Sequence, residues 1–509
     1  MALRQTAQAA AEAPASAPEQ RADLSAYTLI APAFDELALL LFATIIGGIA
    51  LMLEGWWTNV LNLVIPALLM FTMVRGASRS LRLSVAAVWS PLIWMRAAIF
   101  FYGGFGTLIV LVSNDAMRDY AESFFVFYAS DVLKYNVVVL AFALTLLSAC
   151  KFYLLIFGGR RSVTEIFRPS PSSINFAVIG VLFVAIGLAA NLLFILPYQF
   201  GFANTTFPTV ISEIAQAAYI GIFLSLVALR RSRSPLLGVM VGIGVALSLT
   251  GLMAFSKSSA VMPIVMMMLA YFYAKPSIRR LLVMAGSTIA VFFVSAPLVD
   301  HGRYLMQQRY GGIDAPAPPS ERLEMLLSYF DPRSMIAGDE EIDYASLRFS
   351  YVNVGSFVTS LRDQGQSGNT YDNALAVFVP RALWKDKPVI TEIARQLSFE
   401  ATGNWNNSVA PGLAPEAYWN HGWLGVAVMG ALVGLIVSIW SIYSLAVQVA
   451  SAWHLFPVVL LGVRMGSRFD GFFVSDVLGP IAFAVAGHFV LSFVNAAIAR
   501  RNRAVSAAA

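Results

Sequence analysis

Long runs of apolar residues alternate with short polar connections over most of this chain. A helix needs about 20 mostly apolar residues to cross the hydrocarbon core of a bilayer. Twelve runs approach or reach that length: Leu37–Leu53, Trp57–Val74, Ala97–Val112, Tyr135–Phe157, Asn175–Leu196, Thr209–Leu229, Leu236–Phe255, Ala260–Ala274, Leu281–Val299, Trp423–Val447, Leu455–Phe473 and Val477–Ile498. The pattern predicts an all-α polytopic membrane protein of about twelve transmembrane helices.

Two of these spans are irregular. A further apolar stretch, Leu83–Trp94, precedes the third span, contains Pro91 and is separated from the span by Arg96. This arrangement favours an interfacial or re-entrant piece before the third crossing. The eleventh span carries three charged residues in its second half.

Basic residues predict the orientation, because lysine and arginine collect on the cytoplasmic side of membrane proteins. Outside one large loop, the basic clusters all follow even-numbered spans: Arg75, Arg79 and Arg82; Arg160, Arg161 and Arg168; Arg230, Arg231 and Arg233; Lys275, Arg279 and Arg280; Arg500, Arg501 and Arg503. Both termini are therefore expected in the cytoplasm. We expect residues 1–34, rich in Ala, Pro and Gln, to form a disordered cytoplasmic tail, and residues 499–509 to form a second cytoplasmic tail.

Composition narrows the class of protein. Of 509 residues, 58% are hydrophobic and only 12% charged, whereas soluble domains run near a quarter charged. This excludes a cytosolic enzyme and a disordered scaffold. A single cysteine, Cys150, excludes a disulfide framework and a cysteine-based zinc site. The net charge of +5 is accounted for by orientation, so no nucleic-acid partner is expected.

The large hydrophilic region, residues 300–422, lies between spans nine and ten on the predicted extracytoplasmic side. It holds 15 of the 29 acidic residues and 10 of the 34 basic ones. Helical patterns at Ser320–Phe330, Ala345–Leu361 and Thr370–Trp384 are separated by stretches rich in Gly, Pro and Asn. We expect a folded helical cap here, with residues 35–299 forming spans one to nine and residues 423–498 forming spans ten to twelve.

One run in the cap, Val379–Pro388, places Arg381, Lys385 and Lys387 beside Trp384. Arginine offers a planar fork of donors that suits phosphate, and lysine offers a mobile point charge. Tryptophan suits either the membrane interface or stacking on a sugar ring. The alternative is a solvated loop with an interfacial tryptophan, and the residues alone leave both open.

A second constellation leads directly into span ten. Glu416, Tyr418, Asn420 and His421 are expected where the cap meets the membrane. Glu416 and Asn420 are four residues apart, so they share a face if the helix is continuous. A carboxylate or an imidazole in a dry site can act as a general base. The alternative is an ordinary interfacial segment with aromatic residues and an exposed histidine.

Further cations are expected at or near the outer membrane surface. Arg464 and Arg468 are four residues apart on span eleven, where a charge is costly unless it faces a cavity or reaches the interface. Lys257 lies in the short outer turn after span seven, and Arg309 follows span nine. With the cap cations, they imply an anionic ligand. No phosphate-binding loop, dinucleotide motif or metal-ligand spacing is present, so neither a metal nor a cofactor is expected.

Two motifs and the topology carry a resemblance. Pro380-Arg381-Ala-Leu-Trp384-Lys-Asp386-Lys387-Pro388 is similar to a Pro-Arg-x-x-Trp-x-Asp-Lys-Pro pattern, with Lys385 where a proline is expected. Glu416-Ala-Tyr418-Trp-Asn420-His421-Gly422-Trp-Leu-Gly425 is similar to Glu-x-Tyr-x-Asn-aromatic-Gly-x-x-Gly, with His421 at the aromatic position. With about twelve spans and a large outer loop, the chain resembles the bacterial Wzy-type O-antigen or oligosaccharide repeat-unit polymerases.

This resemblance implies a metal-independent glycosyltransferase of the bacterial inner membrane, similar in architecture to other enzymes that use lipid-linked sugars (the GT-C class). Such an enzyme moves a glycan from undecaprenyl pyrophosphate onto a second lipid-linked repeat unit. It also implies membrane lipid, a chain-length regulator and a flippase as partners. Arg381, Glu416 and His421 are then the expected catalytic residues, with Lys257, Arg309, Lys385, Lys387, Arg464 and Arg468 as substrate-binding residues.

Two other functions stay open from the sequence. An O-antigen ligase-type enzyme shares the fold class and the donor but uses a lipid A-core acceptor. A secondary transporter of about twelve spans is the alternative from another class. It is less favoured, because in a major-facilitator protein the long loop follows span six and faces the cytoplasm.

Overall fold

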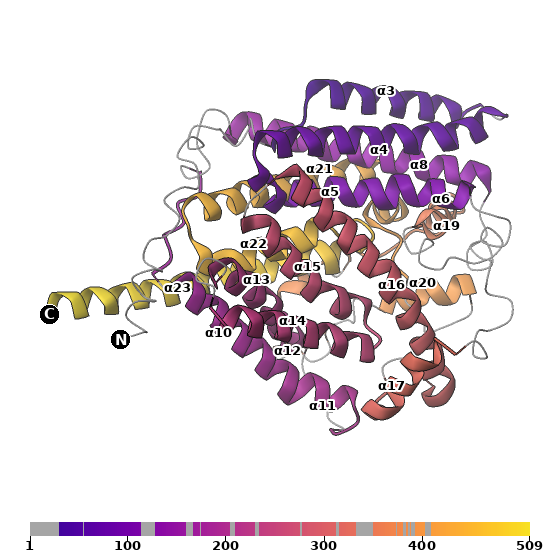
Figure 1. Ribbon diagram of the computed structural model, residues 1–509. Coiled ribbons are helices and arrows are strands. Elements are labelled where there is room, and N and C mark those ends of the chain that lie inside the picture. Colours follow the sequence, from indigo (N-terminus) through magenta and orange to yellow (C-terminus); the bar gives the residue numbers. More distant parts are fainter. Residues whose placement is uncertain are drawn as a thin grey trace. The chain divides into compact units, whose positions relative to one another are not determined.

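A computed structural model describes residues 30–53, 55–112, 128–158, 166–173, 175–203, 209–229, 234–274, 277–311, 315–331, 350–372, 374–379, 383–384, 387, 392–402 and 409–508. Regular structure in these ranges is entirely helical, as predicted, and no strand occurs within them (Figure 1). The chain divides into two compact units. Unit 1 comprises residues 1–18, 172–340 and 495–509, and unit 2 comprises residues 19–171 and 341–494.

Unit 2 is built around the two long helices α8 (Ala129–Tyr153) and α21 (Leu413–Val449), which pack along each other. Two glycines of α21 allow the close approach. A Cβ on Gly434 would lie 2.3 Å from the carbonyl oxygen of Leu146, and one on Gly430 would lie 2.1 Å from Thr145 Oγ1. Small residues at helix contacts are how membrane helices gain van der Waals packing without a hydrophobic driving force.

The other elements of unit 2 surround this pair. They are α3 (Phe34–Ala50), α4 (Trp57–Leu83), η2 (Val85–Trp89), α5 (Pro91–Ala98), η3 (Ile99–Phe105), α6 (Gly106–Val112), η4 (Leu154–Gly158), α19 (Val352–Asp363), η6 (Ala374–Phe378), α20 (Glu392–Thr402), η7 (Trp453–Leu455), α22 (Phe456–Gly466), η8 (Phe473–Leu478) and the first part of α23 (Gly479–Ala508).

Unit 1 contains a second group of apolar helices. They are α10 (Phe176–Ala190), η5 (Asn191–Ile195), α11 (Leu196–Gln199), α12 (Thr209–Ala215), α13 (Ala217–Leu229), α14 (Leu236–Met253), α15 (Lys257–Ala274), α16 (Ile278–Tyr310), α17 (Pro319–Ser328) and the end of α23. Helices α10 and α13 are in close contact. A Cβ on Gly187 of α10 would lie 2.2 Å from the backbone nitrogen of Ala218 in α13, so the glycine allows this approach. At the end of α14, the Phe255 ring is buried against Gly302 of α16.

Eight helical segments of the described chain are long and apolar enough to cross a membrane: Trp57–Leu83, Pro91–Val112, Ala129–Phe157, Ala177–Gln199, Leu236–Met253, Arg279–Tyr310, Leu413–Val449 and Phe473–Val505. Three more predicted spans coincide with the shorter apolar helices Ala217–Leu229, Lys257–Tyr273 and Trp453–Gly466, and the first with the 17-residue α3. The chain is thus a multi-pass membrane protein, while the number twelve stays a prediction.

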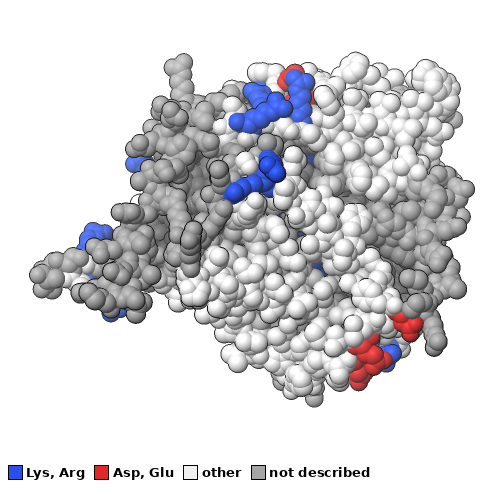
Figure 2. Space-filling view, viewed as in Figure 1, with Lys and Arg blue, Asp and Glu red and all other residues white. Residues whose placement is uncertain are grey.

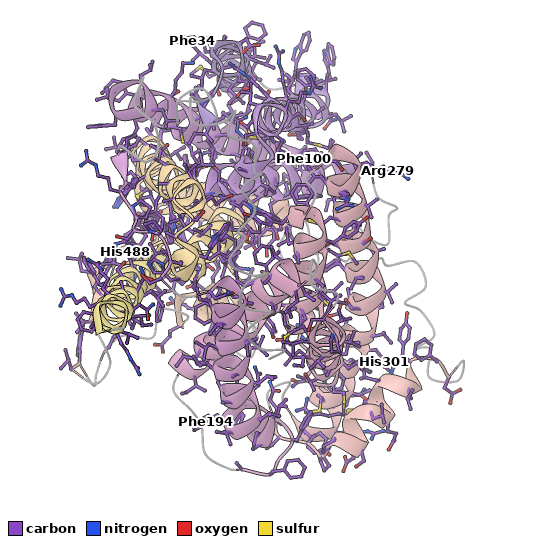
Figure 3. All side chains as sticks on the ribbon, turned by 60° about the vertical axis from the view of Figure 1, so that its left-hand side comes forward. Phe34, Phe100, Phe194, Arg279, His301 and His488 are labelled. Carbon is purple, nitrogen blue, oxygen red and sulfur yellow. The ribbon has the colours of Figure 1, made fainter. Side chains whose placement is uncertain are left out.

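The surface has the character expected of such a protein. Figure 2 shows few charged side chains among the described residues on the face that it presents. Large apolar side chains are exposed instead, among them Phe34 and Phe194, which Figure 3 labels. Exposed apolar patches of this extent mark contact with a lipid or a protein partner rather than with water.

Two predicted spans need correction. Arg96 does not separate two pieces, because the helix runs without a break from Pro91 to Val112. Its guanidinium is buried and pairs with Glu36 of α3 at 2.8 Å, which compensates part of the desolvation of both groups. In the eleventh span, α22 ends at Gly466, so Arg468 and Asp470 lie in the connection that follows the helix and not on it.

The helices predicted within residues 300–422 are partly right, while the cap as a domain stays a prediction. The first helical pattern corresponds to α17, and the second to α19, which ends two residues later than expected. The third, Thr370–Trp384, is wrong over its described part, where only the short 3₁₀ helix η6 forms. Helix α20 was missed. Helices α16 and α21 continue across residues 300 and 422, the expected limits of the cap.

Candidate functional site

The segment that holds Glu416 is a short helix at the start of α21, set off from the rest by a kink. Gly412 precedes it with φ of 89°, and His421 and Gly422 interrupt the helical backbone, with φ of 61° and ψ of −148° at Gly422. Only glycine adopts that combination without strain. Because of the kink, the axis of Leu413–Asn420 differs from that of the rest of α21. Glu416 therefore lies beside the residues that follow α22.

Glu416 is completely buried. Its Oε2 accepts a hydrogen bond from the backbone N–H of Phe473 in η8, at 2.7 Å. Its Oε1 is buried and accepts no hydrogen bond of regular geometry from the described residues, and the Thr370 side chain is the polar group that interacts with the carboxyl. Glu416 is therefore a buried carboxyl group with one well-formed hydrogen bond and one weaker polar contact.

Asn420 locks this short helix to the cap. Its Nδ2 donates to the carbonyl oxygen of Glu416 and to Thr370 Oγ1, both at 2.8 Å, and its Oδ1 accepts from the Thr370 N–H at 3.0 Å. Glu416 and Asn420 therefore lie on the same face of one helix, as their spacing predicts. The side-chain amide uses its donors and acceptor to hold residue 370 beside the Glu416 carboxyl group.

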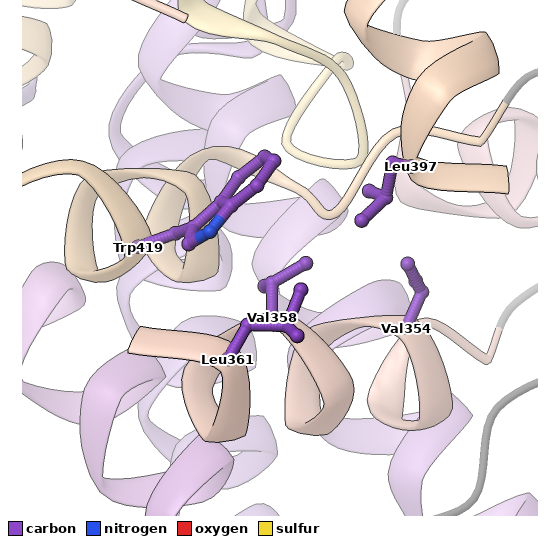
Figure 4. Packing of buried hydrophobic residues seen from close by; sticks show 5 residues of the cluster. All are labelled: Val354, Val358, Leu361, Leu397 and Trp419. Carbon is purple, nitrogen blue, oxygen red and sulfur yellow. The ribbon is translucent and has the colours of Figure 1, made fainter. Parts of the chain in front are cut away.

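Trp419 anchors the same helix in an apolar cluster. Its ring packs with Val354, Val358 and Leu361 of α19 and with Leu397 of α20 (Figure 4). The indole N–H donates to the carbonyl oxygen of Gln366 at 3.0 Å. This core joins two cap helices to the start of α21, and it fixes the position from which Glu416 extends.

A polar network completes the attachment on the other side. The Tyr418 hydroxyl donates to Asp363 Oδ1 at 2.9 Å, and Lys134 of α8 pairs with the same carboxylate. The Lys134 ammonium also lies 5.0 Å from the centre of the Tyr418 ring, within the range of a cation–π contact. Arg362 donates to the carbonyl oxygen of Asn420 at 3.2 Å. The end of α19 thus binds both α8 and α21.

The connection after α22 and the first turn of η8 bring two more carboxylates and one arginine to this place. Arg468 Nε donates to Asp476 Oδ1 at 2.9 Å, and its Nη1 lies 3.5 Å from Asp470 Oδ2. Asp476 also accepts from the Phe472 N–H and from Ser475 Oγ. The Arg468 side chain is 45% exposed, whereas Asp470 is buried. Two carboxylates thus orient a guanidinium that solvent reaches.

Asp470 itself lies between opposing influences. The Tyr351 hydroxyl donates to its Oδ2 at 3.2 Å, and its Oδ1 is buried without a hydrogen-bond partner in the described chain. Burial raises the pKa of Asp470, Arg468 opposes that shift, and the negative charge of Asp476 adds to it. Burial therefore favours the protonated form of the Asp470 carboxyl group, and the neighbouring guanidinium favours the charged form.

Glu416, Asp470 and Asp476, here called the carboxyl cluster, come together through the backbone as well as through charge. The Leu413 N–H donates to the carbonyl oxygen of Phe469 at 2.9 Å, which joins the start of α21 to the connection that carries Asp470. The charge of Asp476 acts on both other carboxyl groups. Two of the three carboxyl groups, Asp470 and Asp476, contact Arg468, and the third is coupled to them through Asp476.

Tyr371 borders the cluster. Its ring centre lies 5.8 Å from that of Phe473 and 5.9 Å from that of His421. Its hydroxyl is buried without a partner among the residues described. Burial raises the pKa of Tyr371 well above its usual value, and the nearby charge of Glu416 acts in the same direction. The phenol therefore stays protonated and can donate a hydrogen bond.

The other predicted residues divide into three groups. Arg381 and Lys385 lie outside the described residues. In unit 2, Lys387 Nζ donates to the carbonyl oxygen of Val379 at 2.9 Å, Arg464 is exposed on the last turn of α22, and His421 is exposed at the kink. In unit 1, Lys257 pairs with Asp300 at 2.5 Å and Arg309 with Glu324 at 3.3 Å.

Sequence reasoning missed Asp476, Tyr351 and Tyr371, and it noted Asp470 without giving it a role. One signal for Asp476 was available, because it is an acidic residue immediately before the apolar run of span twelve, where charge is costly. Tyr351 and Tyr371 carry no such signal, since tyrosine is common at membrane interfaces.

Within the described ranges, no group of three or more His, Cys, Asp or Glu side chains is arranged to hold a metal ion. Comparison with known proteins found no matching protein family, no matching curated protein and no matching solved structure.

Proposed function

We propose that this protein is a membrane glycosyltransferase that polymerises oligosaccharide repeat units carried on undecaprenyl pyrophosphate, at the extracytoplasmic membrane surface. The observation that carries the proposal is the carboxyl cluster. One solvent-reached arginine, Arg468, is held by Asp470 and Asp476, and the charge of Asp476 also acts on the buried carboxyl group of Glu416. The motif resemblance around Arg381 and Glu416 supports the same function.

The reaction asks for two kinds of group. The bond between the anomeric carbon of the donor glycan and its pyrophosphate breaks, and the bonding electrons leave with the pyrophosphate. A hydroxyl oxygen of the acceptor repeat unit forms the new glycosidic bond and loses its proton to a base. A fixed cation stabilises the charge that develops on the leaving group. A positioned carboxylate accepts the proton.

In this proposal, Glu416 is the base and Arg468 contacts the pyrophosphate. Glu416 is completely buried with Thr370 beside its carboxyl group, and the Phe473 N–H, Asn420 and Trp419 hold the segment around it. Arg468 presents its guanidinium to solvent from a position that two carboxylates determine. Arg381 is proposed as a second residue that binds the pyrophosphate, and only its motif supports this role.

The first test is genetic and uses the whole chain. Deletion of the gene should remove the ladder of long glycan chains, while single repeat units still reach the cell surface. Arg381→Ala should give the same result although the protein still inserts and accumulates. Normal chain lengths in the Arg381→Ala strain would remove Arg381 from the proposal, and an intact ladder in the deletion strain would refute the polymerase function.

The second test separates polymerase from ligase and from transporter. The purified protein, reconstituted in lipid nanodiscs, receives only undecaprenyl-pyrophosphate-linked repeat units. A polymerase should convert them into a ladder that stays on the lipid carrier, without lipid A-core. Transfer that occurs only when lipid A-core is added would identify a ligase. The absence of any new glycosidic bond under both conditions would contradict a glycosyltransferase.

A further inference from the structure

The exposed face of α4 changes abruptly from apolar to basic near residue 75. From residue 60 to residue 74, every exposed side chain of this helix is apolar, namely Val60, Leu63, Val64, Ala67, Phe71 and Val74. The last turns then place Arg75, Arg79 and Arg82 on the surface. Their spacings of four and three residues put all three on one side of the helix.

Helix α3 marks the same boundary independently. It packs beside α4 (Figure 1), and its exposed residues are also apolar, including Leu41, Phe42 and Ile45. Asp35, in the first turn of α3, pairs with Arg75. The ion pair places the start of the apolar surface of α3 at the same level as the end of the apolar surface of α4. Figure 2 shows blue side chains gathered beside a red one near the upper edge of the face that it presents.

The distances suit the polar layer of a bilayer. With a rise of about 1.5 Å per residue, Arg79 and Arg82 lie about 6 and 10 Å beyond Arg75 along the helix. The headgroup layer on each side of the hydrocarbon core is about 5–7 Å thick. If the apolar surface of α3 and α4 contacts the acyl chains, the three guanidinium groups lie at or just beyond headgroup depth.

We propose that Arg75, Arg79 and Arg82, here called the arginine face, bind the phosphate groups of anionic phospholipids in the leaflet at this end of α4. No acidic side chain of the described chain pairs with Arg79 or Arg82, and Asp35 supplies one negative charge against three positive ones. Guanidinium groups bind phosphate with paired hydrogen bonds. The apolar surface that leads directly to the arginine face selects a lipid over a soluble acidic partner. This inference is independent of the glycosyltransferase proposal.

Native mass spectrometry of the detergent-purified full chain, with phosphatidylglycerol, cardiolipin or phosphatidylethanolamine added in turn, tests this site. Each basic residue near an anionic surface strengthens binding about fivefold. We therefore expect R75Q/R79Q/R82Q to lose at least tenfold of the apparent affinity for phosphatidylglycerol and cardiolipin, with no change for phosphatidylethanolamine.

Two further variants keep the test decisive. R75K/R79K/R82K retains the charge that orients the protein but loses the guanidinium fork. Its affinity for phosphatidylglycerol and cardiolipin should therefore lie between that of R75Q/R79Q/R82Q and that of the unmodified chain. R500Q/R501Q/R503Q removes the same charge from the end of α23 and should retain the affinity of the unmodified chain. Equal affinity of R75Q/R79Q/R82Q and the unmodified chain would overturn the site. An equal loss in R500Q/R501Q/R503Q would also overturn it, because net charge alone would then explain the binding.

Discussion

The backbone N–H of Phe473 donates a 2.7 Å hydrogen bond to Oε2 of Glu416, a residue 57 positions earlier in the chain. This bond joins the first turn of η8 to the short helix that begins α21. It occupies one oxygen of the carboxyl group, while the other, Oε1, is buried near the Thr370 side chain. In the proposed mechanism the two oxygens have different roles, one holding the side chain in place and the other accepting a proton.

Glu416→Gln should separate these roles. The amide oxygen of glutamine can still accept the Phe473 N–H, so the unfolding temperature should stay close to that of the unmodified chain. The substituted residue no longer accepts a proton, and loss of a general base lowers the rate by about 100-fold or more. Chain-elongation rate in nanodiscs and thermal unfolding are the measurements.

The matched control for this variant is Glu400→Gln, because Glu400 is exposed on α20. It should leave both rate and stability unchanged. A Glu416→Gln protein that elongates chains at the normal rate would exclude Glu416 as the base. A protein that no longer folds would show that the charged form is needed for structure.

Asp476→Asn should weaken donor binding through Arg468. Asp476 holds Nε of Arg468 at 2.9 Å, and the amide of asparagine offers a weaker and uncharged acceptor. We expect the KM for the lipid-linked donor to rise about tenfold, since one charge-assisted contact is worth about 1.5 kcal/mol, with a smaller change in kcat.

A double-mutant cycle shows whether Asp476 acts through the arginine. Arg468→Lys alone should also raise the donor KM, because lysine lacks the planar fork. The double variant should be little worse than either single one, since both remove the same arrangement. Additive effects would mean that Asp476 and Arg468 contribute separately.

Gly422→Ala should disturb the kink that sets the direction of the Glu416 helix. A Cβ at this position meets no atom within 4 Å, so the cost comes from the backbone alone. A non-glycine residue in this conformation costs about 1–3 kcal/mol. The thermal unfolding temperature should fall, and activity should fall with it because the carboxyl cluster depends on this direction.

Gly286→Ala is the control for backbone strain. Gly286 lies inside α16, where an added Cβ also meets no atom within 4 Å, and alanine is favoured over glycine in helices by about 1 kcal/mol. Its stability should be equal or slightly higher. A Gly422→Ala protein as stable as Gly286→Ala would indicate that the kink is not needed.

Trp419→Ala should loosen the cap from α21. The ring belongs to the cluster that joins α19 and α20 to this helix, and removal of a buried tryptophan costs about 3–5 kcal/mol. Trp419→Phe keeps most of the packing but loses the indole hydrogen bond to the carbonyl oxygen of Gln366. We expect this loss to lower the free energy of unfolding by about 1 kcal/mol. Limited proteolysis of the cap and thermal unfolding should rank the variants in this order. Equal behaviour of the two would mean that the packing contributes little.

The candidate site could be predicted only where it depends on neighbours in the chain. Glu416 and Asn420 share a helix face because four residues complete about one turn, and the structure has this arrangement. The same spacing led to a wrong prediction for Arg464 and Arg468. Helix α22 ends at Gly466, so Arg468 lies in the connection after it and not on the helix. Helix ends depend on tertiary contacts that spacing alone does not describe.

The sequence by itself determined that this is a helical membrane protein. Each membrane crossing needs about 20 consecutive apolar residues, and runs of about this length can be read directly from the chain. Only the tertiary structure decided that Asp470 and Asp476 lie beside Glu416, and that Arg96 is buried against Glu36. These partners are separated by about 50 to 60 residues. A charge near the membrane finds its partner wherever packing brings one, so its identity follows from the fold and not from the pattern of neighbouring residues.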